Sequence, residues 1–106
     1  MVHDDALLPE QILWSPNGQY HLKYQADGNL VLYDSTGHDY WNIERWGTPE
    51  RALLKWDGDF AAFHAVNIQV WATGAGGHHG AYLALQDDGN LVVYDLYGNA
   101  IWAHWW

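Results

Sequence analysis

Two nine-residue segments of the chain share one pattern of side chains, Gln-x-Asp-x-Asn-x-Val-x-Tyr. The copies are Gln25, Asp27, Asn29, Val31 and Tyr33, and Gln86, Asp88, Asn90, Val92 and Tyr94. Amide and carboxylate groups supply hydrogen-bond donors and acceptors, and a sugar hydroxyl uses both. No motif position is basic, which disfavours a phosphate or carboxylate ligand. The pattern therefore predicts two sites for a neutral polyol ring, with the valine packing on ring carbons and the tyrosine reaching a further hydroxyl.

The pattern is part of a longer internal repeat. A degenerate copy lies between the two intact ones, with Lys55, Asp57, Asp59, Ala61 and Phe63 at the five positions. The conserved aspartates are spaced by 30 and then 31 residues, and a tryptophan follows each copy by eight residues: Trp41, Trp71 and Trp102. A period near 30 predicts a small unit stacked on itself. We expect one domain, residues 1–106, with repeats at about 14–44, 45–74 and 75–106.

Glycine-containing turns separate segments in which apolar and polar residues alternate, and this predicts an all-β fold. A three-residue loop at 26–28, with Gly28 left-handed, would pair Tyr24 with Leu30 and Leu22 with Leu32. These four residues would then face the core, and the motif side chains would share the opposite face. The same loop in the other repeats places a matching set inward: Leu54, Phe60, Ala62, Leu83, Leu85, Leu91 and Val93.

Composition excludes several classes of partner. The net charge is −9, and the chain has only four Lys and Arg residues together. Nucleic acids and anionic membranes both require cationic side chains, so neither is an expected partner. The chain has no cysteine, no apolar run long enough to insert into a bilayer and no visible signal peptide. Its location is therefore left open between the cytoplasm and export by a route that the sequence does not show.

Catalysis and metal binding are the weaker alternatives. A glycosidase needs two carboxyl groups that flank one bond, whereas each motif offers one aspartate. His78 and His79 are adjacent in a glycine-rich loop and tend to point apart, so we expect no metal site and no cofactor. His21 is placed opposite Tyr33 by the predicted register, where it either tunes binding below neutral pH or is an ordinary surface histidine.

The repeated pattern resembles the signature of the bulb-type, snowdrop-lectin-like mannose-binding lectins, and the likeness covers nearly the whole chain. The resemblance implies a β-prism II fold, with three four-stranded antiparallel sheets around a pseudo-threefold axis. It also implies that Trp41, Trp71 and Trp102 form an interior cluster. The implied function is that of a lectin for mannose or mannose-containing glycans, without catalysis.

The resemblance also implies a role for each motif residue. Asp27 and Asn29 would hold the axial 2-hydroxyl of mannose, Gln25 the 3-hydroxyl and Tyr33 the 4-hydroxyl, while Val31 would contact ring carbons. The third repeat would act in the same way through Gln86, Asp88, Asn90, Val92 and Tyr94. The second repeat, with Lys55, Asp57, Asp59, Ala61 and Phe63, is expected either to have lost mannose binding or to have a changed specificity.

Oligomeric state and the competing function both concern exposed aromatic residues. Members of the family often dimerise by exchanging the C-terminal strand, and the apolar tail Trp102–Trp106 predicts a homodimer through exchange or an interface. The alternative for this tail is packing on its own sheet.

The alternative function is a protein-interaction or self-assembly module with vestigial sugar sites, for which these tryptophans would serve: Trp14, Trp46, Trp56, Trp105 and Trp106.

Overall fold

The structure is a computed structural model that describes residues 1–2 and 4–106. Across these residues the chain forms eleven β-strands and no helix, as the alternating pattern predicts. The strands are β1 (Ala6–Leu7), β2 (Ile12–Trp14), β3 (Tyr20–Tyr24), β4 (Leu30–Asp34), β5 (Asp39–Asn42), β6 (Pro49–Leu54), β7 (Phe60–His64), β8 (Ile68–Ala72), β9 (Tyr82–Leu85), β10 (Leu91–Tyr94) and β11 (Ala100–Ala103).

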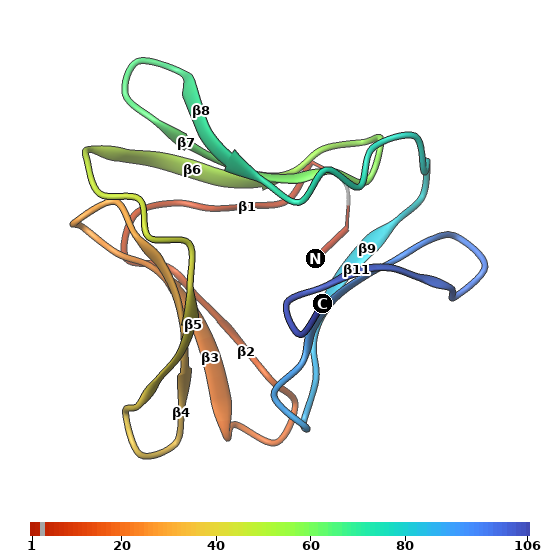
Figure 1. Cartoon of the computed structure of the whole chain (residues 1–106), viewed down its shortest axis with the longest axis horizontal. Coiled ribbons are helices and arrows are strands. Elements are labelled where there is room, and N and C mark those ends of the chain that lie inside the picture. The colour runs from red at the N-terminus through yellow and green to blue at the C-terminus, as the bar shows by residue number, and fades with distance from the viewer. Residues whose placement is uncertain (3) are drawn as a thin grey trace.

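The strands form three antiparallel sheets that surround a common centre like the sides of a triangular prism (Figure 1). Their strand orders are β2-β3-β4-β5, β1-β6-β7-β8 and β9-β10-β11. Each internal repeat supplies three consecutive strands of one sheet, so the threefold architecture predicted from the repeat is confirmed. One detail differs from the prediction, because the third sheet has three strands and not four.

The N-terminal segment connects all three sheets. Within it, β2 pairs with β3 and β1 pairs with β6. Met1 exchanges two backbone hydrogen bonds of 2.8 Å with Leu83 on the outer edge of β9. This segment therefore completes the first and second sheets, and it covers the third sheet at a single residue.

The strand register agrees with the register predicted from the loop length. In the first repeat Tyr24 pairs with Leu30 and Leu22 with Leu32, and the other two repeats pair in the same way. The glycine of each loop has a positive φ, 90° at Gly28, 93° at Gly58 and 86° at Gly89. A three-residue loop with a left-handed glycine thus sets the register of all three hairpins.

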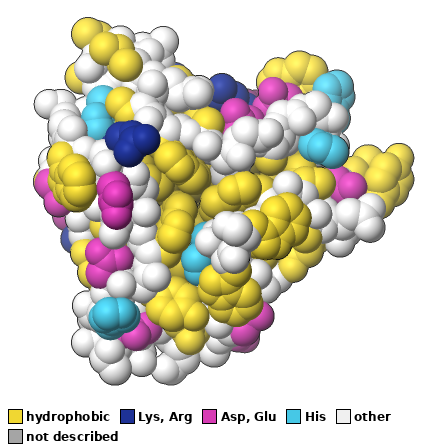
Figure 2. All heavy atoms as spheres, in the orientation of Figure 1, with side chains coloured by type: hydrophobic (Ala, Val, Ile, Leu, Met, Phe, Trp, Pro, Cys, Tyr) yellow, Lys and Arg dark blue, Asp and Glu magenta, His cyan; other side chains and the backbone are white. Residues whose placement is uncertain are grey.

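The core lies where the three sheets approach one another. Leu22, Tyr24, Leu30 and Leu32 have no exposed surface, and they join one apolar cluster with their counterparts from the other repeats. Hydrophobic side chains gather around the middle of the molecule in the space-filling view (Figure 2). The described part of the chain contains no helix that is long and apolar enough to cross a membrane.

The three repeat-related tryptophans meet at this centre. Ring centroids are 5.6 Å apart for Trp41 and Trp71, and each of these lies 5.9 Å from Trp102. All three pairs pack edge to face, the geometry that the charge distribution of aromatic rings favours. One side chain from each repeat therefore closes the centre, and the predicted tryptophan cluster is confirmed.

Candidate functional site

The first intact motif forms one connected set of polar groups on the β3–β4 hairpin, which we call site 1 (Gln25, Asp27, Asn29, Val31 and Tyr33). Asp27 lies in the loop, where its Oδ1 accepts the backbone N–H of Asn29 at 2.9 Å. The Gln25 side-chain amide contacts the Tyr33 hydroxyl. With its amide nitrogen turned towards Asp27, Gln25 donates to both carboxylate oxygens at 3.2 Å and accepts the phenol proton. One glutamine therefore joins the acid to the phenol.

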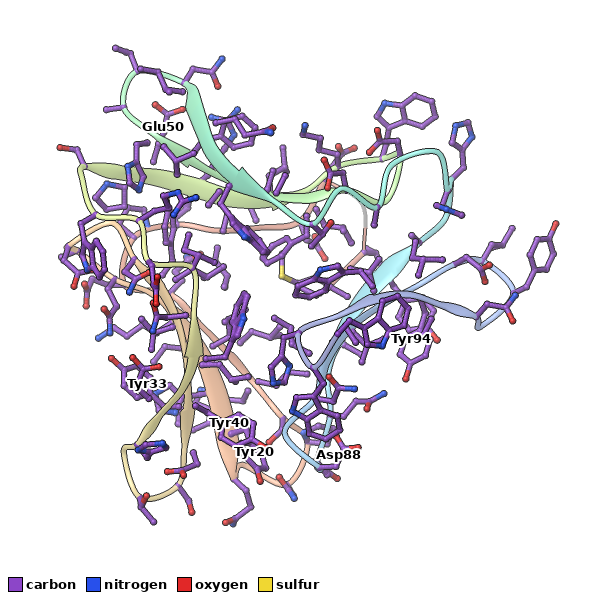
Figure 3. All side chains as sticks on the ribbon, viewed as in Figure 1. Tyr20, Tyr33, Tyr40, Glu50, Asp88 and Tyr94 are labelled. Carbon is purple, nitrogen blue, oxygen red and sulfur yellow. The ribbon has the colours of Figure 1, made fainter. Side chains whose placement is uncertain are left out.

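Site 1 lies on the outer face of its sheet. Its side chains alternate along the strands with the buried Leu22, Tyr24, Leu30 and Leu32. Tyr33 lies on the side of the first sheet that faces away from the other two sheets (Figure 3). The predicted common orientation of the motif side chains is therefore present in the structure.

The two motif valines differ from the prediction in one respect. Val31 and Val92 were expected to be an apolar floor open to a ligand, but each is only 2% exposed. Neither belongs to the central apolar cluster, so the neighbouring side chains of the outer face cover them. A ligand would meet mainly the polar rim of each site, and its ring carbons would reach the valine only after that rim adjusts.

Asn42 is a residue of site 1 that the sequence analysis missed. It lies on β5 opposite Val31, and its Oδ1 accepts the Asn29 side-chain amide at 3.2 Å. The equivalent positions in the other repeats are Ala72 and Ala103. Comparing the residues that follow the three repeat-related tryptophans would have found it, since only the first repeat has a polar side chain there.

The second intact motif repeats this arrangement on the β9–β10 hairpin, which we call site 3 (Gln86, Asp88, Asn90, Val92 and Tyr94). Asp88 accepts the Asn90 backbone N–H at 2.9 Å, and the Gln86 amide contacts the Tyr94 hydroxyl. Among the described side chains, Oδ1 of Asn29 and Oδ1 of Asn90 are both buried without a hydrogen-bond partner. Such groups are costly to leave unpaired, and the same atom is unpaired in both intact copies.

The degenerate copy on the β6–β7 hairpin, site 2, uses its polar groups internally. Oδ1 of Asp59 accepts hydrogen bonds from the Thr73 hydroxyl at 2.8 Å and from the backbone of Gly74 and Ala75. Lys55 donates to Gln69 at 2.9 Å. The bonds to Asp59 fix the segment that follows β8, so this carboxylate is already hydrogen-bonded within the protein.

Phe63 is covered as well. The Arg51 guanidinium lies 4.3 Å from the centre of its ring, a cation–π contact, and Arg51 also pairs with Glu50. The position that carries a tyrosine hydroxyl in sites 1 and 3 is thus an apolar ring beneath a cation. That site 2 has lost mannose binding or has a changed specificity stays a prediction.

His21 pairs with Tyr33 across the strands, as predicted, and its ring stacks on the phenol with centroids 5.1 Å apart. Burial lowers the pKa of His21 below its usual value, and the nearby Lys23 lowers it further. Burial also lowers the pKa of His104, against the raising effects of a Leu91 backbone hydrogen bond and Asp88. Both rings therefore favour the neutral form in the folded protein.

These two histidines predict that acid destabilises the fold. A histidine in the unfolded chain has a pKa of about 6.5, so the unfolded state takes up protons first as the pH falls. We expect the free energy of unfolding, measured in urea, to decrease between about pH 7 and pH 5. Replacing His21 and His104 together with glutamine should flatten this slope. Stability that stays constant or rises on acidification would contradict the assignment.

A separate cleft of about 260 Å³ lies between the 77–79 loop and the β10–β11 turn. It is lined by Gly77, His78, His79, Asp95, Leu96 and Tyr97, and it contains no motif residue. The His79 ring packs against Trp56 at a tilt, with centroids 4.1 Å apart. Among the described residues, no group of three or more His, Asp or Glu side chains is arranged to hold a metal ion.

The structure is similar to several solved lectins. A Marasmius oreades lectin aligns with a TM-score of 0.92 at 24% identity, covering 98% of this chain and 87% of that one. A monomeric mannose-binding lectin from Gastrodia elata aligns with a TM-score of 0.85 at 30% identity, covering 97% and 93%. A domain-swapped lectin dimer from Mycobacterium smegmatis aligns with a TM-score of 0.59 at 36% identity, covering 98% and 96%. No family model and no curated protein sequence matches the chain.

The fold and these similarities define a carbohydrate-binding lectin with the β-prism II architecture. The chain belongs to the bulb-type mannose-binding lectin family, since it is 30% identical to the Gastrodia lectin over nearly the whole of both chains. The family resemblance predicted from the repeated motif is thereby confirmed. Lectins bind sugars without catalysis, and the chain is not an enzyme.

Proposed function

We propose that the chain binds mannose or mannose-containing glycans through sites 1 and 3, and that site 2 does not take part. The observation that carries the proposal is the difference between the copies. In sites 1 and 3 the glutamine amide contacts the tyrosine hydroxyl on an outer face, and the asparagine oxygen lacks a partner. In site 2 the residue at the asparagine position, Asp59, is bonded to Thr73 after β8, and the Phe63 ring lies beneath an arginine.

The proposed chemistry follows from the donor and acceptor set. Asp27 and Asn29 lie side by side and together would engage one hydroxyl from both sides. Asp27 and Asn29 would thus hold the 2-hydroxyl, Gln25 would engage the 3-hydroxyl and Tyr33 the 4-hydroxyl. An epimer whose 2-hydroxyl points elsewhere leaves the Asp and Asn unpaired, which costs binding free energy and selects mannose over glucose. The mannose-binding Gastrodia relative supports this choice of sugar.

Calorimetric titration with methyl α-mannoside tests the proposal, with methyl α-glucoside as the matched control. A shallow monosaccharide site corresponds to a dissociation constant near about 1 mM, or about −4 kcal/mol. We expect two equivalents of mannoside per chain and much weaker binding of the glucoside. Equal affinity for the two epimers, or no binding of either, would contradict the proposal.

We also propose that the chain forms a homodimer through its C-terminal strand. β11 pairs with β10 of its own sheet, but Trp105 and Trp106 at its end remain exposed, and among the described residues no strand pairs with the outer edge of β9. The Mycobacterium relative is a domain-swapped dimer, whereas the Gastrodia relative is monomeric. Sedimentation should show a dimer that Trp105→Ser with Trp106→Ser weakens; a monomer at high concentration would contradict this arrangement.

The exposed tryptophans also leave a second candidate function, a protein-interaction module whose sugar sites are vestigial. Trp14, Trp46 and Trp56 are each more than half exposed, as this alternative requires. The same titration separates the two functions, because a vestigial site would bind neither mannoside nor glucoside.

A further inference from the structure

Three aromatic rings form a row across the first sheet, which we call the aromatic row (Trp14, His21 and Tyr33). Trp14 on β2 pairs with His21 on β3, and His21 pairs with Tyr33 on β4. Ring centroids are 4.8 Å apart in the first pair and 5.1 Å apart in the second. The row therefore runs perpendicular to the strands, from site 1 to the edge of the sheet.

The row lies on the same outer face as site 1 and is continuous with it. His21 and Tyr33 alternate with the fully buried Leu22 and Leu32, and Tyr33 contacts Gln25 within the site. At the far end Trp14 is 54% exposed. Since neighbouring strands are about 4.8 Å apart, Trp14 lies roughly 10 Å from Tyr33. A sugar seated in site 1 would thus have an open aromatic surface beside it.

Within the described residues, such a three-ring row occurs at site 1 alone. In the third sheet Tyr82 stacks on Tyr94 with centroids 5.3 Å apart, but no strand pairs with β9 at that end to add a third ring. In the second sheet the group over Phe63 is the Arg51 guanidinium and not a ring. Site 3 therefore offers an internal comparison: the same motif without the exposed tryptophan.

We propose that site 1 is an extended site that binds a neutral oligosaccharide, with a second subsite over Trp14. A pyranose has an apolar C–H face and a hydroxyl rim, and a half-exposed indole offers a flat apolar face with a polar tip. Lys23 is the cation nearest the row on β3, and it is already paired with Glu10 at 2.9 Å. Lys23 therefore has little charge to offer an acidic ligand, and Asp39, which pairs with Tyr33 across β4 and β5, would repel one. Both features favour an uncharged chain over an acidic one.

This inference rests on the proposed function, because it adds a second ring to the mannose in site 1. The test compares methyl α-mannoside with α-linked mannotriose by calorimetry, and follows the indole N–H signals by NMR. We expect mannotriose to bind one site about tenfold more tightly than the monosaccharide does. The Trp14 indole signal should shift with mannotriose and stay in place with the monosaccharide.

Three variants make the test specific. Trp14→Ala should lose most of the mannotriose gain and keep its monosaccharide affinity, whereas Trp14→Phe retains a ring and should keep much of the gain. Trp56→Ala is the matched control, since Trp56 is also exposed but lies in the loop of site 2 and outside the row. A gain that survives Trp14→Ala, or that Trp56→Ala removes equally, would overturn the extended site and leave the proposed function standing. Failure of the wild type to bind even methyl α-mannoside would overturn both.

Discussion

We expect the combined substitution Asn29→Ala and Asn90→Ala to abolish measurable mannose binding. Each asparagine shares the proposed 2-hydroxyl with a neighbouring aspartate, and losing one such hydrogen bond costs about 1–3 kcal/mol. From a starting value near about −4 kcal/mol, this loss raises the dissociation constant to between about 5 and 150 mM. Calorimetry or tyrosine fluorescence with methyl α-mannoside measures the effect.

The matched control is Asn99→Ala, which removes an exposed side-chain amide from the β10–β11 turn, where it bonds to Asp95 and not to a motif residue. It should bind like the wild type. Thermal unfolding of the double variant should still show one cooperative transition, because the apolar core contains neither asparagine. Full affinity in a folded double variant would mean that sugar binds elsewhere or not through these amides.

The second large effect is on stability, at the glycine in the site 1 loop. Gly28 has a φ of 90°, and a Cβ added there would lie 2.5 Å from the Gly47 carbonyl oxygen and 2.6 Å from its nitrogen. Alanine would therefore combine an unfavourable backbone conformation with a backbone clash. We expect Gly28→Ala to lower the free energy of unfolding by about 3 kcal/mol or more, as measured in urea.

Gly37→Ala is the control for this prediction. Gly37 also has a positive φ, 82°, but an added Cβ there meets no atom within 4 Å. Gly37→Ala should therefore lower the free energy of unfolding by only about 1 kcal/mol, the cost of a left-handed backbone conformation for alanine. Similar losses at the two positions would show that the contact between Gly28 and Gly47 is not as close as the structure has it.

Much of the fold is predictable from local pattern. The side-chain period of a strand is two, so choosing a three-residue loop places Leu22 and Tyr24 inward and the motif side chains outward in one step. The repeat then transfers that result to the other two hairpins. The spacing from each motif to Trp41, Trp71 and Trp102 predicts that these residues are equivalent under the threefold repeat, and the family resemblance implies that they meet at the centre.

The features that sequence reasoning missed depend on pairing between distant segments. β1 is two residues long and carries no period of its own, so nothing local assigns it to the second sheet beside β6. The contact of Met1 with Leu83 spans nearly the whole chain. The three-stranded third sheet follows from the same cause, since its outer edge depends on where the N-terminal segment runs.

The motif residues that lie together were predictable, but their burial and their hydrogen-bond partners were not. The motif supplies the five positions, whereas Asn42 comes from a neighbouring strand that the motif does not include. The burial of Val31 depends on how surrounding side chains pack. The engagement of Asp59 with Thr73 and the following backbone likewise requires the path of the chain after β8.

A crystal structure of the protein soaked with methyl α-mannoside would test the central claim most directly. We expect one sugar ring against Gln25, Asp27, Asn29 and Tyr33, a second against Gln86, Asp88, Asn90 and Tyr94, and none against Asp59 and Phe63. A ring bound at the degenerate copy as fully as at the other two, or bound only outside all three hairpins, would contradict it.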